Sequence, residues 1–566
     1  MCRTFPLALA LALVPALARA QADTTSALAP CDGRVVSAIE ITREPPPLLS
    51  RSTFARPIVA AVLQHVTTKP KAILPFMQVK VGQPCSEFRL AESGRVLRAQ
   101  PYLANASVRA VPDSNNTVRI EVSTVDEIPL VIGMQLRGTA VSSMRYGNSN
   151  ILGNGMYGAV SWRRGFAYRE GFGARYVDYH LLDMPNTLNF TAERYPVSAH
   201  YELSVSHPFY TPFQQTAWFA GYRRLEDYDG FLRPDGSVLS LSVHRERYDM
   251  GGVVRLGGGT VRFFVGPLYT HESIVPAANA VVLSDTGFAT DPDSTLQGRY
   301  ASVRGGRFGG VFGVRALTFR TVTGFDALAG TQDVGQGVQL ATTLAQSIGG
   351  GQRGDLWSTD AYAGVVSGSS YLAIRTTWES ERQPRLHRWG DVVGSGRLAW
   401  YHKPNDRQTQ IWSLEFAGSW RQQTPFQLTL GDHDGGVRGY SDSRLVGGQR
   451  LVLRSEHRWL LGGFTKFDNI GIAAFSDAGR MWAGGVPYGQ DVSIRVSAGI
   501  GLLLAIPKQS RRLMRADLAV PLVPDRNAHY ELRFTISTPF NTLWSEPGAI
   551  ARLRSATPAT NIFSWP

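Results

Sequence analysis

The sequence has few charged residues, few cysteines and no long apolar stretch beyond its N-terminus. Charged residues make up 18% of the 566 positions, whereas glycine (58 residues) and aromatic residues (10%) are plentiful. After the N-terminus, no uninterrupted apolar run reaches the roughly 18–20 residues that a membrane helix needs. Helical membrane spans are therefore excluded. Barrel strands are not, because they give a much weaker hydropathy signal.

The motifs of common enzyme and metal sites are also missing. The sequence contains no His-Glu-x-x-His, paired Cys-x-x-Cys, Gly-x-Ser-x-Gly or phosphate-binding loop. His433 stands beside Asp434 in a loop, without the third residue of a catalytic triad. We therefore expect no enzyme activity, no metal and no cofactor.

The N-terminus predicts export. Arg3 precedes an apolar run over residues 5–17 and an Ala18-Arg19-Ala20 cleavage site, which indicates a signal peptide over residues 1–20. Two cysteines remain after cleavage, Cys31 and Cys85. In an exported protein they can pair as a disulfide or stay as free thiols, and the sequence leaves both open.

The chain is basic, with a formal net charge of +13. Such a balance can indicate nucleic-acid binding when the basic residues are clustered. Here they are dispersed along alternating segments. This pattern favours a basic channel lining or basic residues near anionic lipid headgroups, and we expect no nucleic acid as a partner.

The residues that follow the signal predict a small α+β domain over 33–128. Apolar periodicity and turn residues give the order strand, helix, helix, strand, strand. Ser86 is a good N-cap for the second helix. The predicted elements are a strand at 34–42, helices at 54–65 and 86–99, and strands at 106–111 and 117–125.

Residues 129–540 consist of alternating segments separated by turns. In one of them, Ile494, Val496 and Ala498 alternate with Arg495 and Ser497. A strand with one apolar and one polar face suits a wall between lipid and water, so we predict a transmembrane antiparallel β-barrel. An array of soluble β-sandwiches is the alternative, but it leaves the signal peptide and the aromatic strand ends unexplained.

A glycine-rich loop at 431–440 stands between two strongly alternating segments. Its glycines allow sharp turns and close backbone approach, and Arg438 is its single cation. A guanidinium in a confined space needs acidic partners. By strand parity, Glu456 and Asp477 both lie on the polar face of the next two segments, so we expect them to pair with Arg438.

Val437-Arg438-Gly439-Tyr440, followed by Phe475-x-Asp477-x-Gly479, resembles the BamA/TamA superfamily of outer-membrane barrels. That superfamily includes bacterial surface antigens and the two-partner secretion transporters. The resemblance implies a barrel of about 16 strands whose Arg-Gly-Tyr loop folds into the lumen, where the arginine meets acids on the inner wall. The alternative is a hairpin loop with an incidental arginine.

The domain at 33–128 resembles a POTRA domain, the periplasmic module of the same superfamily. BamA-like members of the superfamily carry several POTRA domains and the secretion transporters usually two, whereas this sequence contains one that we can find. The resemblance implies an outer-membrane transporter or insertase for unfolded outer-membrane or secreted polypeptides. It also implies contact with outer-membrane lipid and with periplasmic accessory proteins. A passive pore or surface antigen without transport activity is the alternative function.

The C-terminus departs from the superfamily pattern. Tyr530, Leu532, Phe534 and Ile536 lead into a segment ending at Phe540 that resembles the terminal strand of outer-membrane proteins. The chain nevertheless continues over 541–566. This extension contains Pro547 and Pro558 together with serine and threonine. It reads either as an irregular extension or as a plug of the lumen.

Overall fold

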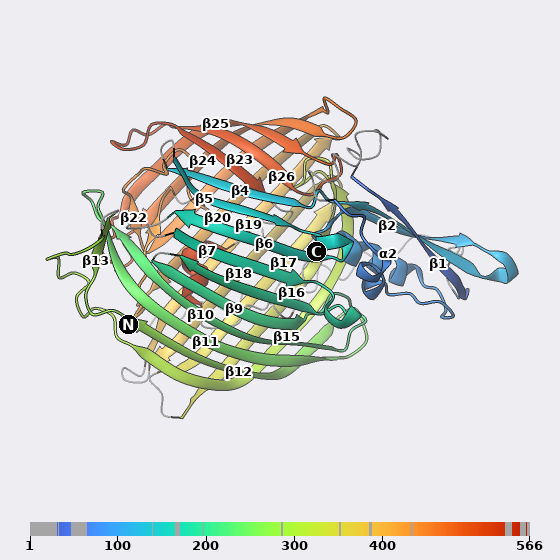
Figure 1. Ribbon diagram of the computed structural model, residues 1–566, viewed down its shortest axis with the longest axis horizontal. Helices are drawn as coiled ribbons and strands as arrows, with labels where there is room; N and C mark the ends of the chain where they lie inside the picture. Colours follow the sequence, from blue (N-terminus) through green and yellow to red (C-terminus); the bar gives the residue numbers. More distant parts are fainter. Residues whose placement is uncertain are drawn as a thin grey trace.

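A computed structural model gives the structure of the chain as a small N-terminal module beside a large β-barrel (Figure 1). The predicted signal peptide at 1–20 and most of the first predicted helix at 54–65 lie outside the residues that the structure describes. The described residues are 31, 33–46, 65–137, 140–164, 170–195, 197–284, 287–349, 353–383, 388–431, 433, 435–537, 546–554 and 562.

The described part of the N-terminal module has a three-stranded sheet with the helix α2 against it. In the sheet order β1-β3-β2, β1 runs parallel to β3 and β2 runs antiparallel to it. Helix α2 follows Ser86, as expected, and buries Leu90, Val96 and Leu97 in the core of the module. The elements are β1 (Val36–Glu44), the 3-10 helices η4 (Pro70–Ala72) and η5 (Leu74–Phe76), α2 (Glu87–Arg98), β2 (Leu103–Pro112), η6 (Ser114–Asn116) and β3 (Val118–Asp126).

Cys31 and Cys85 form a disulfide in this core, and both side chains are buried. The bond connects the start of the described chain to the turn that precedes α2. It closes a loop of 54 residues. In the chain-entropy model, a cross-link of this span stabilises the fold by about 4 kcal/mol.

The barrel is a single closed antiparallel sheet in which β27 returns to β4. In Figure 1 the cyan strand β4 lies next to the orange and red strands β23–β26. Two short connections outside the wall are η7 (Ile151–Gly153) and η9 (Leu181–Asp183). The strands are β4 (Leu130–Arg137), β5 (Ala140–Asn148), β6 (Met156–Arg164), β7 (Glu170–Asp178), β8 (Thr187–Tyr195), β9 (Ser198–His207), β10 (Thr216–Leu232), β11 (Val238–Leu256), β12 (Arg262–Pro276), β13 (Val281–Ser284), β14 (Gly287–Thr290), β15 (Val303–Thr323), β16 (Thr331–Ile348), β17 (Asp355–Ser367), β18 (Ser370–Gln383), β19 (Arg388–Asn405), β20 (Gln408–Trp420), β23 (Gln449–Gly462), β24 (Asn469–Trp482), β25 (Val492–Ala505), β26 (Leu513–Pro521) and β27 (Glu531–Ser537).

The expected count of about 16 strands is too low. The closed order contains 22 strands, of which β13 and β14 form a short hairpin while β12 pairs directly with β15. Twenty strands therefore make up the wall. The difference arises in the first part of the barrel, where strands of 8 to 10 residues follow one another closely and use less chain per strand than we assumed.

Strand parity separates the two faces of the wall as predicted. On β23 and β24, Leu453 and Ile472 are exposed on the outer face, whereas Glu456 and Asp477 are buried on the inner face. The outer face of β27 presents Phe534 in the same way. An apolar exterior and a polar interior are typical of a barrel in lipid.

The module sits at one end of the barrel, with α2 and its sheet beyond the strand ends (Figure 1). Arg98 of α2 forms an ion pair of 2.7 Å with Asp333 at the start of β16. Glu127, at the end of the module, accepts a hydrogen bond of 2.7 Å from Ser510 in the loop before β26. These contacts fix the module to the barrel rim. No helix in the described part of the chain is long and apolar enough to cross a membrane.

The described residues of the C-terminal extension lie against the inner wall of the barrel. Residues 546–554 include a short helix, α4 (Gly548–Leu553), which contacts β19 and β20. Ile562 is buried among residues of β10, β11 and β12. Of the two alternatives for the extension, the described part matches packing within the lumen.

Candidate functional site

The glycine-rich loop leaves the wall between β20 and β23 and folds into the lumen. A two-stranded sheet at its base pairs β21 (Leu428–Thr429) with β22 (Val446–Gly447). At Gly431 the returning chain passes so close that an added Cβ would lie 1.8 Å from the carbonyl oxygen of Tyr440. Gly435 and Gly439 have positive φ angles of 89° and 88°. Glycine is therefore required for this inward path.

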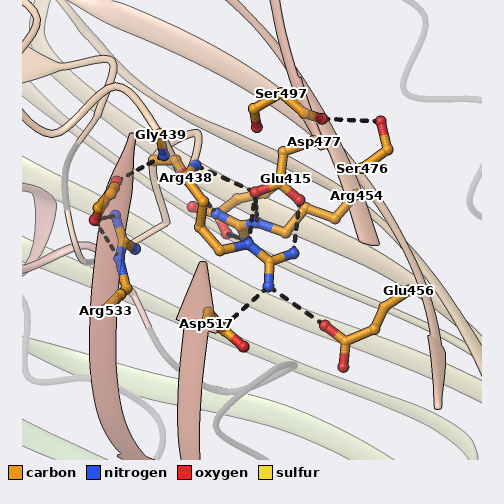
Figure 2. A network of polar contacts seen from close by, with 12 residues as sticks. Glu415, Arg438, Gly439, Arg454, Glu456, Ser476, Asp477, Ser497, Asp517 and Arg533 are labelled. Carbon is orange, nitrogen blue, oxygen red and sulfur yellow. Dashed lines mark hydrogen bonds and ion pairs between the residues drawn. The ribbon is translucent and has the colours of Figure 1, made fainter. Parts of the chain in front are cut away.

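Arg438 lies at the centre of a network of acidic side chains (Figure 2). Its guanidinium donates Nε and Nη2 hydrogen bonds of 2.8 and 2.7 Å to the two carboxylate oxygens of Asp477. Its Nη1 donates to Glu456 and Asp517 at 3.4 and 3.3 Å. Arg438 is 7% exposed and Asp477 is fully buried. The two-pronged geometry is the strong form of an arginine–carboxylate pair.

The other motif residues on β24 shape the space around the arginine. The ring of Phe475 lies under the guanidinium, with 3.5 Å between Cζ and the ring centroid, so it adds a cation–π contact. An added Cβ at Gly479 would lie 2.3 Å from Cγ2 of Val437. Phe475, Asp477 and Gly479 thus support the loop by stacking, charge and absence of a side chain, respectively.

Gly439 and Tyr440 attach the tip of the loop to the last strands of the barrel. The backbone N–H of Gly439 donates a 2.6 Å hydrogen bond to Glu531 on β27. The Tyr440 hydroxyl lies 3.0 Å from the carbonyl oxygen of Val496 and 2.8 Å from that of Val523. These contacts place the Tyr440 hydroxyl beside β25 and the segment after β26.

Further arginines share the same acids. Arg515 donates two 3.0 Å hydrogen bonds to Glu456 and one to Asp517. Arg458 pairs with Glu456 at 2.5 Å. Arg454 donates to the carbonyl oxygen of Gly436 at 2.7 Å and so holds the loop backbone itself. Because buried charges are stable only when they are paired, loss of one member leaves others uncompensated.

The structure brings together the residues that the motifs singled out. Val437, Arg438, Gly439 and Tyr440 meet a wall formed by Glu456, Phe475, Asp477 and Gly479. Sequence reasoning had not assigned Asp517 or Glu531 to the site, although both lie on inward-facing positions of alternating strands. Their role depends on which strands the tip of the loop contacts. Strand parity predicts the face on which a side chain lies, but not these contacts.

We call this network of Arg438, Gly439, Glu456, Asp477, Asp517 and Glu531 the clamp. In it, carboxylates accept hydrogen bonds from guanidinium groups and from backbone amides of the loop. Through it the loop is bound to β23, β24, β26 and β27 at the same time. Such a network can hold or release a segment of chain inside the lumen.

Comparison with known proteins adds independent findings. The family model of the Omp85 superfamily domain matches residues 421–540. No curated protein sequence matches the chain.

Among the solved structures that are similar to the chain are one BamA and two CdiB proteins. BamA from Haemophilus ducreyi lacking POTRA domains 1–3 is 12% identical, with a TM-score of 0.39 over 89% of this chain and 84% of that chain. CdiB from Escherichia coli is 12% identical, with a TM-score of 0.39 over 92% of each chain. CdiB from Acinetobacter baumannii is 10% identical, with a TM-score of 0.40 over 89% of this chain and 74% of that chain.

The matched segment contains the luminal loop and the strands that carry Glu456, Asp477, Asp517 and Glu531. The resemblance to the BamA/TamA superfamily is therefore confirmed, and residues 421–540 match the Omp85 superfamily domain.

Proposed function

We propose that the protein is a polypeptide transporter or insertase of the bacterial outer membrane, with no enzymatic activity. The observation that carries the proposal is the clamp. Arg438 fixes the loop to β23, β24 and β26, and Gly439 joins the loop to β27, the strand at which the barrel closes. A loop bound to the closing strand is positioned to couple events in the lumen to the seam of the barrel.

The seam between β27 and β4 supports this function. The described part of β27 has 7 residues and that of β4 has 8, whereas β15 and β16 have 21 and 18. Every backbone group in lipid must be hydrogen-bonded, so a short pairing gives fewer bonds to separate than a long one. An insertase that opens laterally needs such a seam.

The N-terminal module supports the capture of an unfolded chain. We propose that it is a single POTRA-like domain in the periplasm. In its sheet, β1 and β2 are the outer strands, each paired with β3. An extended peptide can add to the edge of such a sheet through backbone hydrogen bonds. The contacts between Arg98 and Asp333 would then bring the captured chain to the mouth of the barrel.

The proposal can be tested with the full chain reconstituted in phospholipid vesicles. An unfolded outer-membrane barrel is added in diluted urea, and its heat-resistant folded form is followed on gels over time. We expect faster insertion than into empty vesicles or vesicles containing Arg438→Ala. A secreted polypeptide, scored by protection from external protease, tests the transporter arm. If the rates of barrel insertion and of polypeptide protection are the same for all vesicles, the protein is a passive pore or surface antigen.

A further inference from the structure

The C-terminal extension reaches the inner wall through an ion pair of its own. Arg554 donates two 2.8 Å hydrogen bonds from Nε to the carboxylate of Glu546, and its side chain is buried. Ser395 on β19 donates a 2.5 Å hydrogen bond to the same carboxylate. Arg554 also donates at 2.5 Å to the hydroxyl of Thr377 on β18. The pair is therefore held on the inward faces of two neighbouring strands.

The same residue is held from a distant part of the wall. Arg247 on β11 donates a 3.1 Å hydrogen bond to the carbonyl oxygen of Arg554. In the barrel order, β11 is separated from β18 by β12, β15, β16 and β17. Residues 546–554 therefore connect two parts of the wall across the lumen.

One apolar cluster contains side chains of both the extension and the glycine-rich loop. Ile550 of α4 is fully buried in a cluster that includes Val437 and Tyr440 of the glycine-rich loop. Because α4 and the loop contribute side chains to one buried cluster, displacement of one changes the packing of the other.

A second contact lies further along the extension. Ile562 is 2% exposed and packs in a cluster with Phe209, Phe219 and Phe264. Its carbonyl oxygen accepts a 2.7 Å hydrogen bond from the backbone N–H of Phe209. Because polar and apolar contacts form at separate places on the wall, the extension has a defined binding position inside the barrel.

We propose that the inner faces of β18 and β19, together with the glycine-rich loop, form a peptide-binding site, and that residues 546–554 are its intramolecular occupant. The site takes a short helical segment in which an acidic and a basic side chain flank an aliphatic one. When residues 546–554 occupy the site, they narrow the lumen. Their displacement by a transported chain rests on the proposed function, whereas their binding to the wall does not.

The occupancy can be tested without any transport substrate. Ion conductance through single barrels in planar bilayers is measured for the full chain and for a variant that lacks residues 541–566. We expect the truncated barrel to conduct severalfold more. A synthetic peptide covering residues 546–562 should return its conductance toward the starting value, whereas a scrambled peptide should not. Equal conductance of the two barrels, with both folded by heat-modifiable gel migration, would overturn the proposal.

A matched pair of point variants tests the proposal even if the truncated barrel does not fold. Arg554, which follows α4, is buried and paired, whereas Arg552 within α4 is exposed. We expect Arg554→Ala to raise the frequency of high-conductance openings and Arg552→Ala to leave it unchanged. The same frequency in both variants would contradict a seat built around the Glu546–Arg554 pair.

A transport measurement separates this proposal from the proposed function. If the extension is an occupant that substrate displaces, the truncated barrel should transport at least as fast as the full chain. Raised conductance with no transport in either barrel would support occupancy and overturn the transport function. Raised conductance with transport lost only on truncation would show that the extension drives transport, and would overturn its displacement by substrate.

Discussion

Two parts of the barrel wall differ in strand length and in burial. In the short-strand arc, β4–β9 over residues 130–207, strands have 8 to 10 residues and most described side chains are only half-buried. In the loop-bearing arc, β20 and β23–β27 over residues 408–537, β23, β24 and β25 have 14 residues each. On β24 buried and exposed residues alternate almost without interruption.

The difference follows from what lies inside the barrel. The glycine-rich loop packs on the loop-bearing arc, and the C-terminal extension packs on β18 and β19 and on β10–β12, so inward side chains there are buried. The short-strand arc has fewer such partners on its inner face. The two arcs meet at the seam between β27 and β4.

The largest expected effect is that of Arg438→Ala in the loop-bearing arc. The change leaves Asp477, Glu456 and Asp517 without their shared cation, which costs about 3–5 kcal/mol locally when a buried pair is broken. The many strand hydrogen bonds should keep the barrel assembled. We expect loss of transport and a loop more open to external protease, measured by vesicle insertion and limited proteolysis.

Arg480→Ala is the matched control, because Arg480 lies on the same strand as Asp477 but faces outward. We expect it to transport normally. Normal transport by Arg438→Ala, or the absence of a cross-link between cysteines placed at 438 and 477, would show that the clamp is not needed.

Arg438→Lys should have a smaller effect, because it keeps the charge. Lysine lacks the planar fork that contacts both oxygens of Asp477 and cannot stack on Phe475 in the same way. We expect the barrel to assemble with the loop partly protected, and transport to be only weakly restored relative to Arg438→Ala. Restoration to the wild-type rate would mean that charge alone carries the function.

Gly479→Ala compares the two arcs directly. The new methyl group would overlap Val437, whereas at Gly133 on β4 an added Cβ would meet Cβ of Arg145 at an ordinary 3.5 Å. Overpacking of this kind costs about 1–3 kcal/mol. We expect Gly479→Ala to lower the heat stability of the folded band and expose the loop to protease, and Gly133→Ala to leave the heat stability unchanged. Equal stability of the two variants would contradict the difference in packing.

The smallest expected effect is that of Glu202→Gln in the short-strand arc. Glu202 pairs with Arg223 at 3.1 Å, but the arginine side chain is 56% exposed. Ion pairs that contact solvent contribute about 0–1 kcal/mol. We therefore expect stability by urea titration and transport both to remain near wild type. A loss as large as that of Arg438→Ala would mean that the two arcs are equally constrained.

Much of this site could be predicted from local sequence rules. Period-two alternation placed Glu456 and Asp477 on the inner face, and the glycines of the loop indicated a turn into the lumen. The helix after Ser86 followed from its apolar spacing, although the Ser86 side chain forms no capping hydrogen bond. These features depend on neighbours in the sequence, which a single chain displays directly.

The rest depends on contacts between distant segments. Glu531 joins the site because the loop tip reaches β27, 92 residues further along the chain. The number of strands depends on which alternating segments pair, and Arg554 meets Thr377 across 177 residues. Periodicity does not encode such pairings. The predicted number of strands was therefore too low, and the sequence did not decide between the two positions of the extension.

The disulfide in the N-terminal module makes its stability depend on the compartment. In a reducing cytosol Cys31 and Cys85 remain thiols, so the chain lacks the cross-link until it meets an oxidant. Under the proposed location, the precursor would cross the inner membrane in its less stable form. The module would gain its cross-link only after export, beside the membrane in which the barrel assembles.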